Sequence, residues 1–174
     1  MSALATDIDI RPIRRGDDVL GLILPIQQQE FALAITAADQ PDLADIDGFY
    51  RRGAGEFWVA AQGERIIGCI ALIDIGASGA LIDIGATGAL IDIGERGGVV
   101  RKMFVAVDHR GRSAGVAQRL LDVLTAHAVK AGLTALWLGT TEKFLAAHRF
   151  YEKNGFSVIA VLCSNRHHWP IELT

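Results

Sequence analysis

Residues 107–117 form the segment of the sequence best suited to hold a phosphorylated ligand. The segment reads VDHRGRSAGVA and joins a predicted strand to a predicted amphipathic helix. A strand, a tight glycine turn and a helix N-terminus together direct free backbone N–H groups and the positive end of the helix dipole at one point. Gly111 and Gly115 permit close approach of the backbone, and Arg110 and Arg112 add positive charge. A phosphate or diphosphate would fit there.

The same segment argues against two common nucleotide-binding loops. It contains neither the GxGxxG pattern of dinucleotide-binding proteins nor the GxxxxGK[ST] pattern of P-loop proteins. A nucleotide held here would therefore be bound by a different arrangement of main-chain donors and arginines.

A second segment that could do chemistry is residues 147–156, which read AHRFYEKNGF. The pattern predicts a helix over residues 144–154 that is stopped by Gly155, with Phe156 packing back on the helix end. Tyr151 on this helix could donate a proton, although a tyrosine on an amphipathic helix is most often a packing residue. Its catalytic role therefore depends on the phosphate-binding segment lying nearby.

Hydrophobic periodicity predicts the elements that must position these two segments. In chain order they are a strand over 8–13, a helix from 19 toward 31 that Pro25 kinks or divides, a helix over 42–50 opened by Pro41, a hairpin over 56–75 that turns at 62–64, a strand over 98–107, a helix over 116–130 with Gly132 as C-cap, a strand over 135–139, the helix over 144–154, and strands over 157–162 and 168–173. This order is that of an α/β fold with a mixed sheet.

A nine-residue unit occurs three times between the predicted hairpin and the next strand. Residues 71–79, 80–88 and 89–97 read ALIDIGASG, ALIDIGATG and ALIDIGERG. Each copy predicts a five-residue strand and a four-residue turn, so successive copies should form antiparallel hairpins. Two added copies contribute an even number of strands and leave the direction of the chain unchanged. We expect an extra β-hairpin arm, whose exposed edge a second subunit could cover to give a homodimer.

The repeat leaves two further points open. Copies one and three could each pair with the strand over 98–107. A calcium-binding nonapeptide roll is an alternative, but its GGxGxD pattern is missing. Asp74, Asp83 and Asp92 are therefore expected to form a solvated stripe, and no metal site is predicted.

Three segments together resemble the GNAT acetyltransferase superfamily. Residues 112–117, RSAGVA, match its [RQ]-x-x-G-x-[GA] acetyl-CoA signature, and the preceding KMFV, residues 102–105, is similar to its central strand. Residues 147–156 are similar to its A-x-x-x-Y-E-K-x-G-F helix. The predicted order of elements also agrees with that family, so the resemblance covers nearly the whole chain outside the inserted copies.

The resemblance implies a fold and a reaction. The fold would be one GNAT domain over residues 1–174, with a mixed, mostly antiparallel central sheet flanked by helices and the repeat at 71–97 inserted between two antiparallel strands. The reaction would move the acetyl group of acetyl-CoA to a primary amine by direct attack, without a covalent enzyme intermediate. A backbone N–H within residues 104–107 would hold the oxyanion, and Tyr151 would protonate the leaving thiolate.

The resemblance also implies which residues bind the co-substrate acetyl-CoA. Backbone groups of two valines would meet the acetyl and pantetheine arms where the strand bulges and splays, the signature loop would cradle the pyrophosphate, and a lysine would help at the nucleotide end. The full set is Val105, Val107, Arg110, Arg112, Ser113, Ala114, Gly115, Val116, Ala117 and Lys153.

The sequence departs from the family pattern at two places. Many members carry Asn seven residues before the tyrosine, where this chain has Phe144, so that Thr140 or Thr141 would take over the helix capping. Members often place a Glu on the central strand, whereas residues 99–102 read VVRK. A general base is therefore not assigned, and an ordered chain of waters is an alternative.

Composition and charge restrict the other possibilities. The chain has 174 residues, of which 51% are hydrophobic and 21% charged, and these values indicate one globular domain. A net charge of -3 gives no broad basic field for nucleic acid. The apolar stretch over 66–93 is interrupted by aspartates and glycines, which excludes a membrane-spanning helix. Acidic residues within 1–10 do not match a signal peptide, so a cytoplasmic location is expected.

The remaining expectations concern thiols and partners. Cys69 and Cys163 lack the spacing of a zinc site or a disulfide framework and are expected to be buried or half-buried thiols. The acceptor would be a small-molecule or peptide amine, recognised by residues 31–50 and the C-terminal strands. The alternative from another class is a non-catalytic module that binds acyl-CoA as a sensor, and Tyr151 favours the enzyme.

Overall fold

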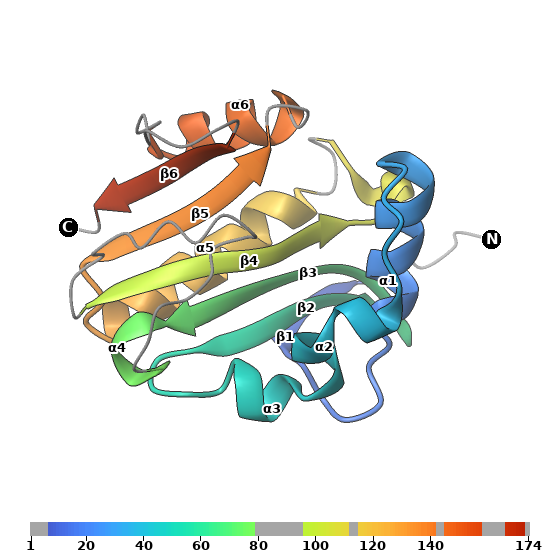
Figure 1. The fold of residues 1–174 in the computed structure, drawn as a ribbon, viewed down its shortest axis with the longest axis horizontal. Helices are drawn as coiled ribbons and strands as arrows, with labels where there is room; N and C mark the ends of the chain where they lie inside the picture. The colour runs from blue at the N-terminus through green and yellow to red at the C-terminus, as the bar shows by residue number, and fades with distance from the viewer. Residues whose placement is uncertain (1–6, 79–95, 112–114, 142–144, 158–165, 173–174) are drawn as a thin grey trace.

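The computed structural model describes residues 7–78, 96–111, 115–141, 145–157 and 166–172. One six-stranded sheet runs in the order β1-β2-β3-β4-β5-β6 (Figure 1). Its strands are β1 (Ile8–Pro12), β2 (Glu56–Gln62), β3 (Arg65–Asp74), β4 (Gly97–Val105), β5 (Ala135–Thr141) and β6 (Arg166–Glu172). All neighbouring pairs are antiparallel except β4 and β5, which are parallel. The predicted mixed, mostly antiparallel sheet is confirmed.

The centre of the sheet forms the core because both of its faces are covered. The side chains of Phe57, Val59, Ile67 and Ile70 are fully buried, as the nearly continuous apolar runs of β2 and β3 require. Helix α5 (Val116–Lys130) crosses behind the sheet, whereas α2 (Pro41–Ala44) and α3 (Ile46–Phe49) lie in front of it (Figure 1).

Helix α5 begins and ends at the residues that the sequence predicted. Gly132 has φ +79°, its N–H donates to the carbonyl of Val129, and the N–H of Leu133 donates to the carbonyl of Ala128. These two bonds satisfy the last carbonyl groups of the helix in the left-handed ending that glycine favours. At the other end, the absence of a side chain on Gly68 lets the helix approach β3, since a Cβ there would lie 3.0 Å from atoms of Val116 and Leu120.

The N-terminal helices are more divided than the sequence predicted. Helix α1 (Leu20–Pro25) continues as a π-helical turn, η1 (Ile26–Glu30), because Pro25 lacks the N–H that a regular α-helix would use. The helix predicted over 42–50 is split into α2 and α3, with a short 3₁₀ helix η2 (Ala37–Asp39) before them. The side chain of Asp45 accepts the N–H of Gly48 and so starts a new helix at that position.

The first copy of the repeat takes part in the sheet. Residues Ala71 to Asp74 pair with Arg101 to Gly98 of β4, so copy one supplies the partner of the central strand. The prediction of a strand continuing through Ile75 is wrong, because Ile75–Ser78 forms the short helix α4. Gly and, to a lesser degree, Ala are depleted in strands, which explains why the strand stops there. Residues 79–95, and with them the expected hairpin arm, lie outside the described residues.

Asp74 also departs from the expected solvated stripe. It is partly buried, and its carboxylate accepts the N–H of Ala54 at 2.8 Å. The other two aspartates of the stripe, Asp83 and Asp92, lie outside the described residues. Cys69 is buried as predicted, and Cys163 is likewise outside the described part. None of the described helices has the length and apolar character needed to cross a membrane.

Helix α6 (Leu145–Lys153) ends in the predicted way. Gly155 has φ +88°, its N–H donates to the carbonyl of Glu152, and the N–H of Phe156 donates to the carbonyl of Tyr151. The rings of Tyr151 and Phe156 then pack edge to face with centroids 5.4 Å apart. The turn at the end of α6 therefore places Phe156 against the ring of Tyr151 and holds that ring in position.

We predict that Gly155→Val lowers the free energy of unfolding by about 1 to 2 kcal/mol, because a β-branched residue is strained at this positive φ. Gly155→Asn should cost less, since Asn adopts the left-handed conformation more readily. Urea unfolding of both variants measures the difference. Equal losses for Val and Asn would contradict a backbone origin.

Candidate active site

The two central parallel strands separate at their carboxyl ends. Only residues Gly97–Val100 of β4 pair with β5, through Ala135–Leu138, although β4 continues beside β3 to Val105 and β5 continues beside β6 to Thr141. The edge of β4 after Val100 therefore has no strand partner on the β5 side in the described chain. Its backbone groups there are available to a ligand, and such openings at strand carboxyl ends are where α/β sheets bind ligands.

A β-bulge lies on β4 within the open stretch. Cys69 pairs with Phe104 and Ala71 pairs with Arg101, so two residues of β4 oppose the single residue Ile70 of β3. One of the two is Lys102, which has φ +53°. A bulge at this strand was expected from the resemblance, whereas the residue in the left-handed conformation was not.

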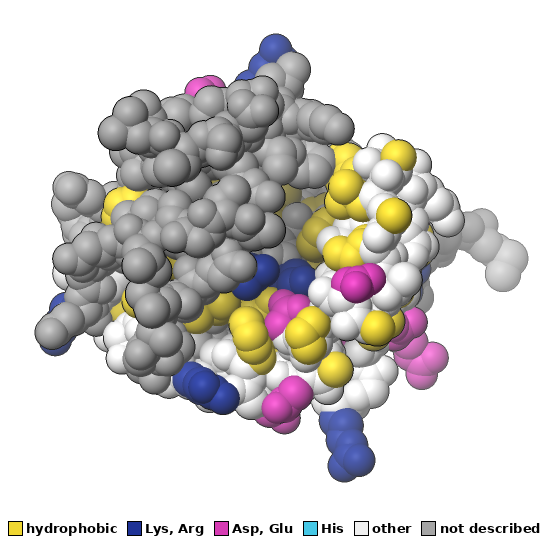
Figure 2. All heavy atoms as spheres, viewed as in Figure 1, with side chains coloured by type: hydrophobic (Ala, Val, Ile, Leu, Met, Phe, Trp, Pro, Cys, Tyr) yellow, Lys and Arg dark blue, Asp and Glu magenta, His cyan; other side chains and the backbone are white. Residues whose placement is uncertain are grey.

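A cleft of about 610 Å³ occupies the opening. It is bounded by η1 and its following loop on one side and by α6 on the other, with β4 as its floor. Figure 2 shows Lys and Arg side chains within the hollow at the centre of the molecule. The lining residues that bear on chemistry are Glu30, Arg101, Lys102, Phe104, Val105, Arg110 and Tyr151.

The N-terminus of α5 offers main-chain donors near this cleft. Gly115 is its N-cap residue, with φ +58°, and no side chain caps the helix. The first N–H groups of an α-helix have no acceptor inside the helix, so those of Val116 and Ala117 remain available for an anion. Val116 is buried against the sheet, which holds this helix end in place. Arg112, Ser113 and Ala114, which were predicted to complete the loop, lie outside the described residues.

The Arg110 side chain is held by protein groups. Its Nη1 and Nη2 donate to the two carboxylate oxygens of Glu30 at 2.6 and 2.9 Å, and its Nε donates to the carbonyl of Val105 at 2.8 Å. The guanidinium therefore links η1 to the open end of β4. If Arg110 binds a ligand phosphate as predicted, the phosphate has to share these donors with Glu30 and Val105. The carbonyl of Val105, which was predicted to meet pantetheine, already accepts one hydrogen bond.

Tyr151 lies at the α6 wall of the cleft and is buried. Its ring packs edge to face against Phe150 and Phe156, with centroid distances of 5.3 and 5.4 Å. Burial raises the pKa of the Tyr151 phenol above its usual range. The hydroxyl makes no hydrogen bond to any residue that the structure describes. A protonated phenol in a cleft, without a hydrogen bond to the described residues, is suited to act as a proton donor.

Other predicted site residues lie as follows. Val107 opens a short 3₁₀ helix, η3 (Val107–His109), and is 64% exposed, so the strand ends earlier than predicted. The chain turns away from β3 at this point, because the N–H of His109 donates to the carbonyl of Ala106 at 2.9 Å, and Arg65 at the start of β3 pairs with Asp108. Lys153 is exposed in the last turn of α6. Phe144, which replaces the family's usual Asn, lies outside the described residues, and so do the side chains proposed to replace it.

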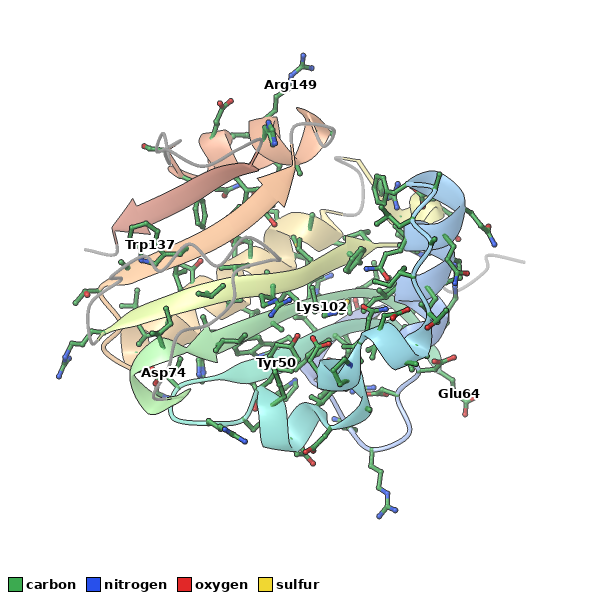
Figure 3. The ribbon with its side chains drawn as sticks, viewed as in Figure 1. Tyr50, Glu64, Asp74, Lys102, Trp137 and Arg149 are labelled. Atoms are coloured by element: carbon green, nitrogen blue, oxygen red, sulfur yellow. The ribbon has the colours of Figure 1, made fainter. Side chains whose placement is uncertain are left out.

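A buried polar cluster on the cleft side of the sheet was missed by the sequence analysis. The Nζ of Lys102 donates to Gln40 Oε1 at 2.8 Å and lies 3.2 Å from Asp42 Oδ2, which also accepts the hydroxyl of Tyr50. Figure 3 shows Tyr50 and Lys102 in front of the sheet. Burial, followed by the nearby Asp42 charge, raises the pKa of Tyr50, while burial lowers the pKa of Lys102 against the opposing effect of Asp42.

The Lys102, Gln40, Asp42 and Tyr50 cluster ties the bulge to α2. Gln40 in turn donates to Gln27 of η1 at 3.0 Å, so the contacts reach the wall of the cleft. These residues are separated by up to 75 positions in sequence and share no motif, which is why no pattern indicated them. The sequence analysis noted the VVRK segment only because it lacks the Glu that family members often carry on this strand.

Comparisons with known proteins agree with this arrangement. The model of the acetyltransferase (GNAT) family matches residues 23–156. Among solved structures, an acetyltransferase of the GNAT family from Staphylococcus aureus Mu50 is similar with a TM-score of 0.76 and 27% identity, covering 97% of this chain and 100% of that chain. An acetyltransferase from Streptococcus agalactiae has the same fold, with a TM-score of 0.78, 23% identity, and coverage of 95% and 98% of the two chains.

The curated relatives are longer than this chain. Human N-acetylaspartate synthetase is 28% identical over 139 residues, which are 79% of this chain and 40% of that protein. The chain thus spans about two fifths of the length of that relative. The family match, by contrast, extends over most of the chain and includes the open strands, the α5 N-terminus and Tyr151. The chain belongs to the acetyltransferase (GNAT) family.

Proposed function

We propose that the protein is an acetyl-CoA-dependent N-acetyltransferase that moves the acetyl group to an amine. The observation that carries this proposal is the cleft in which the unpaired end of β4 and the buried phenol of Tyr151 meet. Family membership supports acetyl transfer, and the similarity to N-acetylaspartate synthetases supports nitrogen as the accepting atom.

The described residues fit the chemistry of acetyl-CoA. The uncapped N-terminus of α5 presents N–H groups to the diphosphate. Gly115, in its left-handed conformation and without a side chain, lets the ligand approach the protein backbone closely. The open edge of β4 offers donors and acceptors to the pantetheine amides, in the manner of an added strand. Lys153 and the loop residues 112–114 are proposed to complete the nucleotide site.

The reaction needs three contributions from the chain. The neutral acceptor amine attacks the thioester carbonyl and forms the C–N bond, while a backbone N–H of residues 104–107 stabilises the oxyanion. The C–S bond then breaks, and Tyr151 gives its proton to the leaving thiolate. The surplus proton of the amine leaves through solvent, and the tyrosine is restored by that route. No residue forms a covalent bond to the acetyl group.

Release of free thiol from acetyl-CoA in the presence of a panel of amines tests the proposed function. We expect amine-dependent thiol release and an acetylated product of the matching mass. Stabilisation of the protein by coenzyme A, without turnover of any amine, would favour the alternative of a non-catalytic acyl-CoA sensor.

The remaining sequence-based expectations stay proposals. We propose that residues 1–174 make one GNAT domain, that the part of the repeat after Ser78 forms an inserted β arm, and that a second subunit covers its edge. A cytoplasmic location and the absence of nucleic-acid and membrane partners are predictions of the same kind. Light scattering of the intact chain would measure the subunit number.

Tyr151→Phe should lower kcat about 100-fold or more, because it removes the proton donor to the thiolate. The phenylalanine keeps the ring contacts to Phe150 and Phe156, so the melting temperature should change little. Glu152→Gln, on the exposed side of the same helix turn, is the matched control and should retain activity. A Tyr151→Phe variant with unchanged kcat would exclude the phenol as general acid.

The pH dependence of kcat should follow the raised pKa of Tyr151. A raised pKa means that the phenol keeps its proton to a higher pH, so no descending limb caused by this residue should occur below about pH 10. Rates measured from neutral pH upward check this. A limb centred near pH 8 that disappears in Tyr151→Phe would show that the phenol ionises early and would contradict its protonated state.

Gly115→Val should raise KM for acetyl-CoA about 10-fold or more, because a β-branched residue at φ +58° distorts the helix end that receives the diphosphate. Acetyl-pantetheine lacks the diphosphate, and its KM should stay nearly constant. Gly115→Asn serves as the conservative control. Equal increases for both thioesters would place the diphosphate elsewhere.

A further inference from the structure

Arg101 differs from Arg11, the other arginine whose side chain the structure describes as partly buried. Arg11 pairs with Asp17 at 2.7 Å. Arg101 is partly buried in the floor of the cleft and has neither an ion pair nor a hydrogen bond to any described residue. A charged side chain that is partly buried and has no partner among the described residues loses part of its hydration without compensation from them.

Among the described residues, the charges around the cleft balance except at Arg101. Glu30 neutralises Arg110, and Asp42 neutralises Lys102. Among the described charged residues that line the cleft, this leaves Arg101 as the positive charge without a counterpart. Burial, and to a smaller extent the charge of Arg101, lowers the pKa of Lys102, so the two cations lie within electrostatic reach of each other. A small anion entering the cleft would compensate this excess.

The position of Arg101 suits an acceptor group more than the thioester. It is three residues before Phe104 on β4, a distance of about 10 Å in a regular strand and less across a bulge. The amine must reach the thioester near Phe104 and Val105, while another part of the acceptor extends along β4 toward Arg101. A planar guanidinium binds a carboxylate through two parallel hydrogen bonds.

We propose that Arg101 binds a carboxylate of the acceptor, so that the protein acetylates small amines that carry a carboxylate. This inference rests on the proposed N-acetyltransferase function and names its substrate class. Arg101 thereby acts as the specificity-determining residue, while the neighbouring Lys102 is held by Asp42 and Gln40 and keeps the strand in the bulged form.

The test compares acceptors that differ only in a carboxylate. β-Alanine and L-aspartate are each measured beside their neutral amides, β-alaninamide and L-aspartic diamide, with acetyl-CoA as donor. The wild-type chain should prefer the carboxylates, and Arg101→Gln should reduce kcat/KM for them about 10- to 100-fold, chiefly through KM. The amides and KM for acetyl-CoA should change little. Arg101→Lys should give an intermediate loss.

Arg149→Gln is the matched control, since Arg149 is exposed and points away from the cleft (Figure 3). It should leave all acceptors unchanged. Melting curves establish that each variant is folded before kinetics are compared. Equal losses for a carboxylate and its amide in Arg101→Gln, or a wild-type chain that acetylates both equally, would overturn the inference.

A binding measurement separates this inference from the proposed function. N-Acetyl-β-alanine and its amide are added to the chain in the presence of coenzyme A, and thermal stabilisation is recorded. Stabilisation by the carboxylate alone, lost in Arg101→Gln and kept in Arg149→Gln, supports the carboxylate site even if no amine is acetylated, in which case only the transferase function fails. Stabilisation that is equal for the two compounds, absent for both, or unchanged in Arg101→Gln rejects the site.

Discussion

The early end of the pairing between β4 and β5 is the constraint on which the site depends. Pairing stops at Val100 and Leu138, yet each strand continues beside its outer neighbour. The backbone of β4 therefore forms hydrogen bonds with β3 along one edge, while its other edge after Val100 has no strand partner in the described chain. Backbone groups left open within a protein require another partner. A ligand with amide groups of its own can supply that partner.

The bulge and the polar cluster make this geometry stable enough to persist. An extra residue in β4 bends the strand away from β5. Lys102 in this bulge has a left-handed backbone conformation, which is unfavourable for residues other than glycine. Its Nζ is fixed by Gln40 and Asp42, and its carbonyl accepts the thiol of Cys69 at 3.1 Å. Burial raises the pKa of that thiol to about 12, so it remains a donor. Several contacts from different elements thus hold one strained residue.

Local signals in the sequence predicted the parts of the fold that depend on neighbouring residues. The bounds of α5, the glycine endings of α5 and α6, and the packing of Phe156 on Tyr151 all follow from caps and periodicity within a few positions. The β2 and β3 hairpin is of the same kind. Tyr151 was proposed as the proton donor because of its motif, and its burial beside the cleft is consistent with that role.

Features that depend on distant residues could not be predicted in this way. The Lys102 conformation requires Gln40 and Asp42 from another element, and the engagement of Arg110 requires Glu30, eighty positions earlier in the chain. The splitting of α2 and α3 by Asp45 is local, but the periodicity of the apolar residues concealed it. Arg101 was only noted as a departure from the family pattern, because its lack of a partner is visible only when its surroundings are known.

The conformation of Lys102 has an evolutionary consequence. A glycine at this position would relieve the backbone, so the backbone conformation by itself favours replacing the lysine. The replacement would also delete the cation that Asp42 faces, leaving a carboxylate and a phenol together in an apolar interior. The four members of that network should consequently change together among descendants of this chain, as a unit and seldom singly.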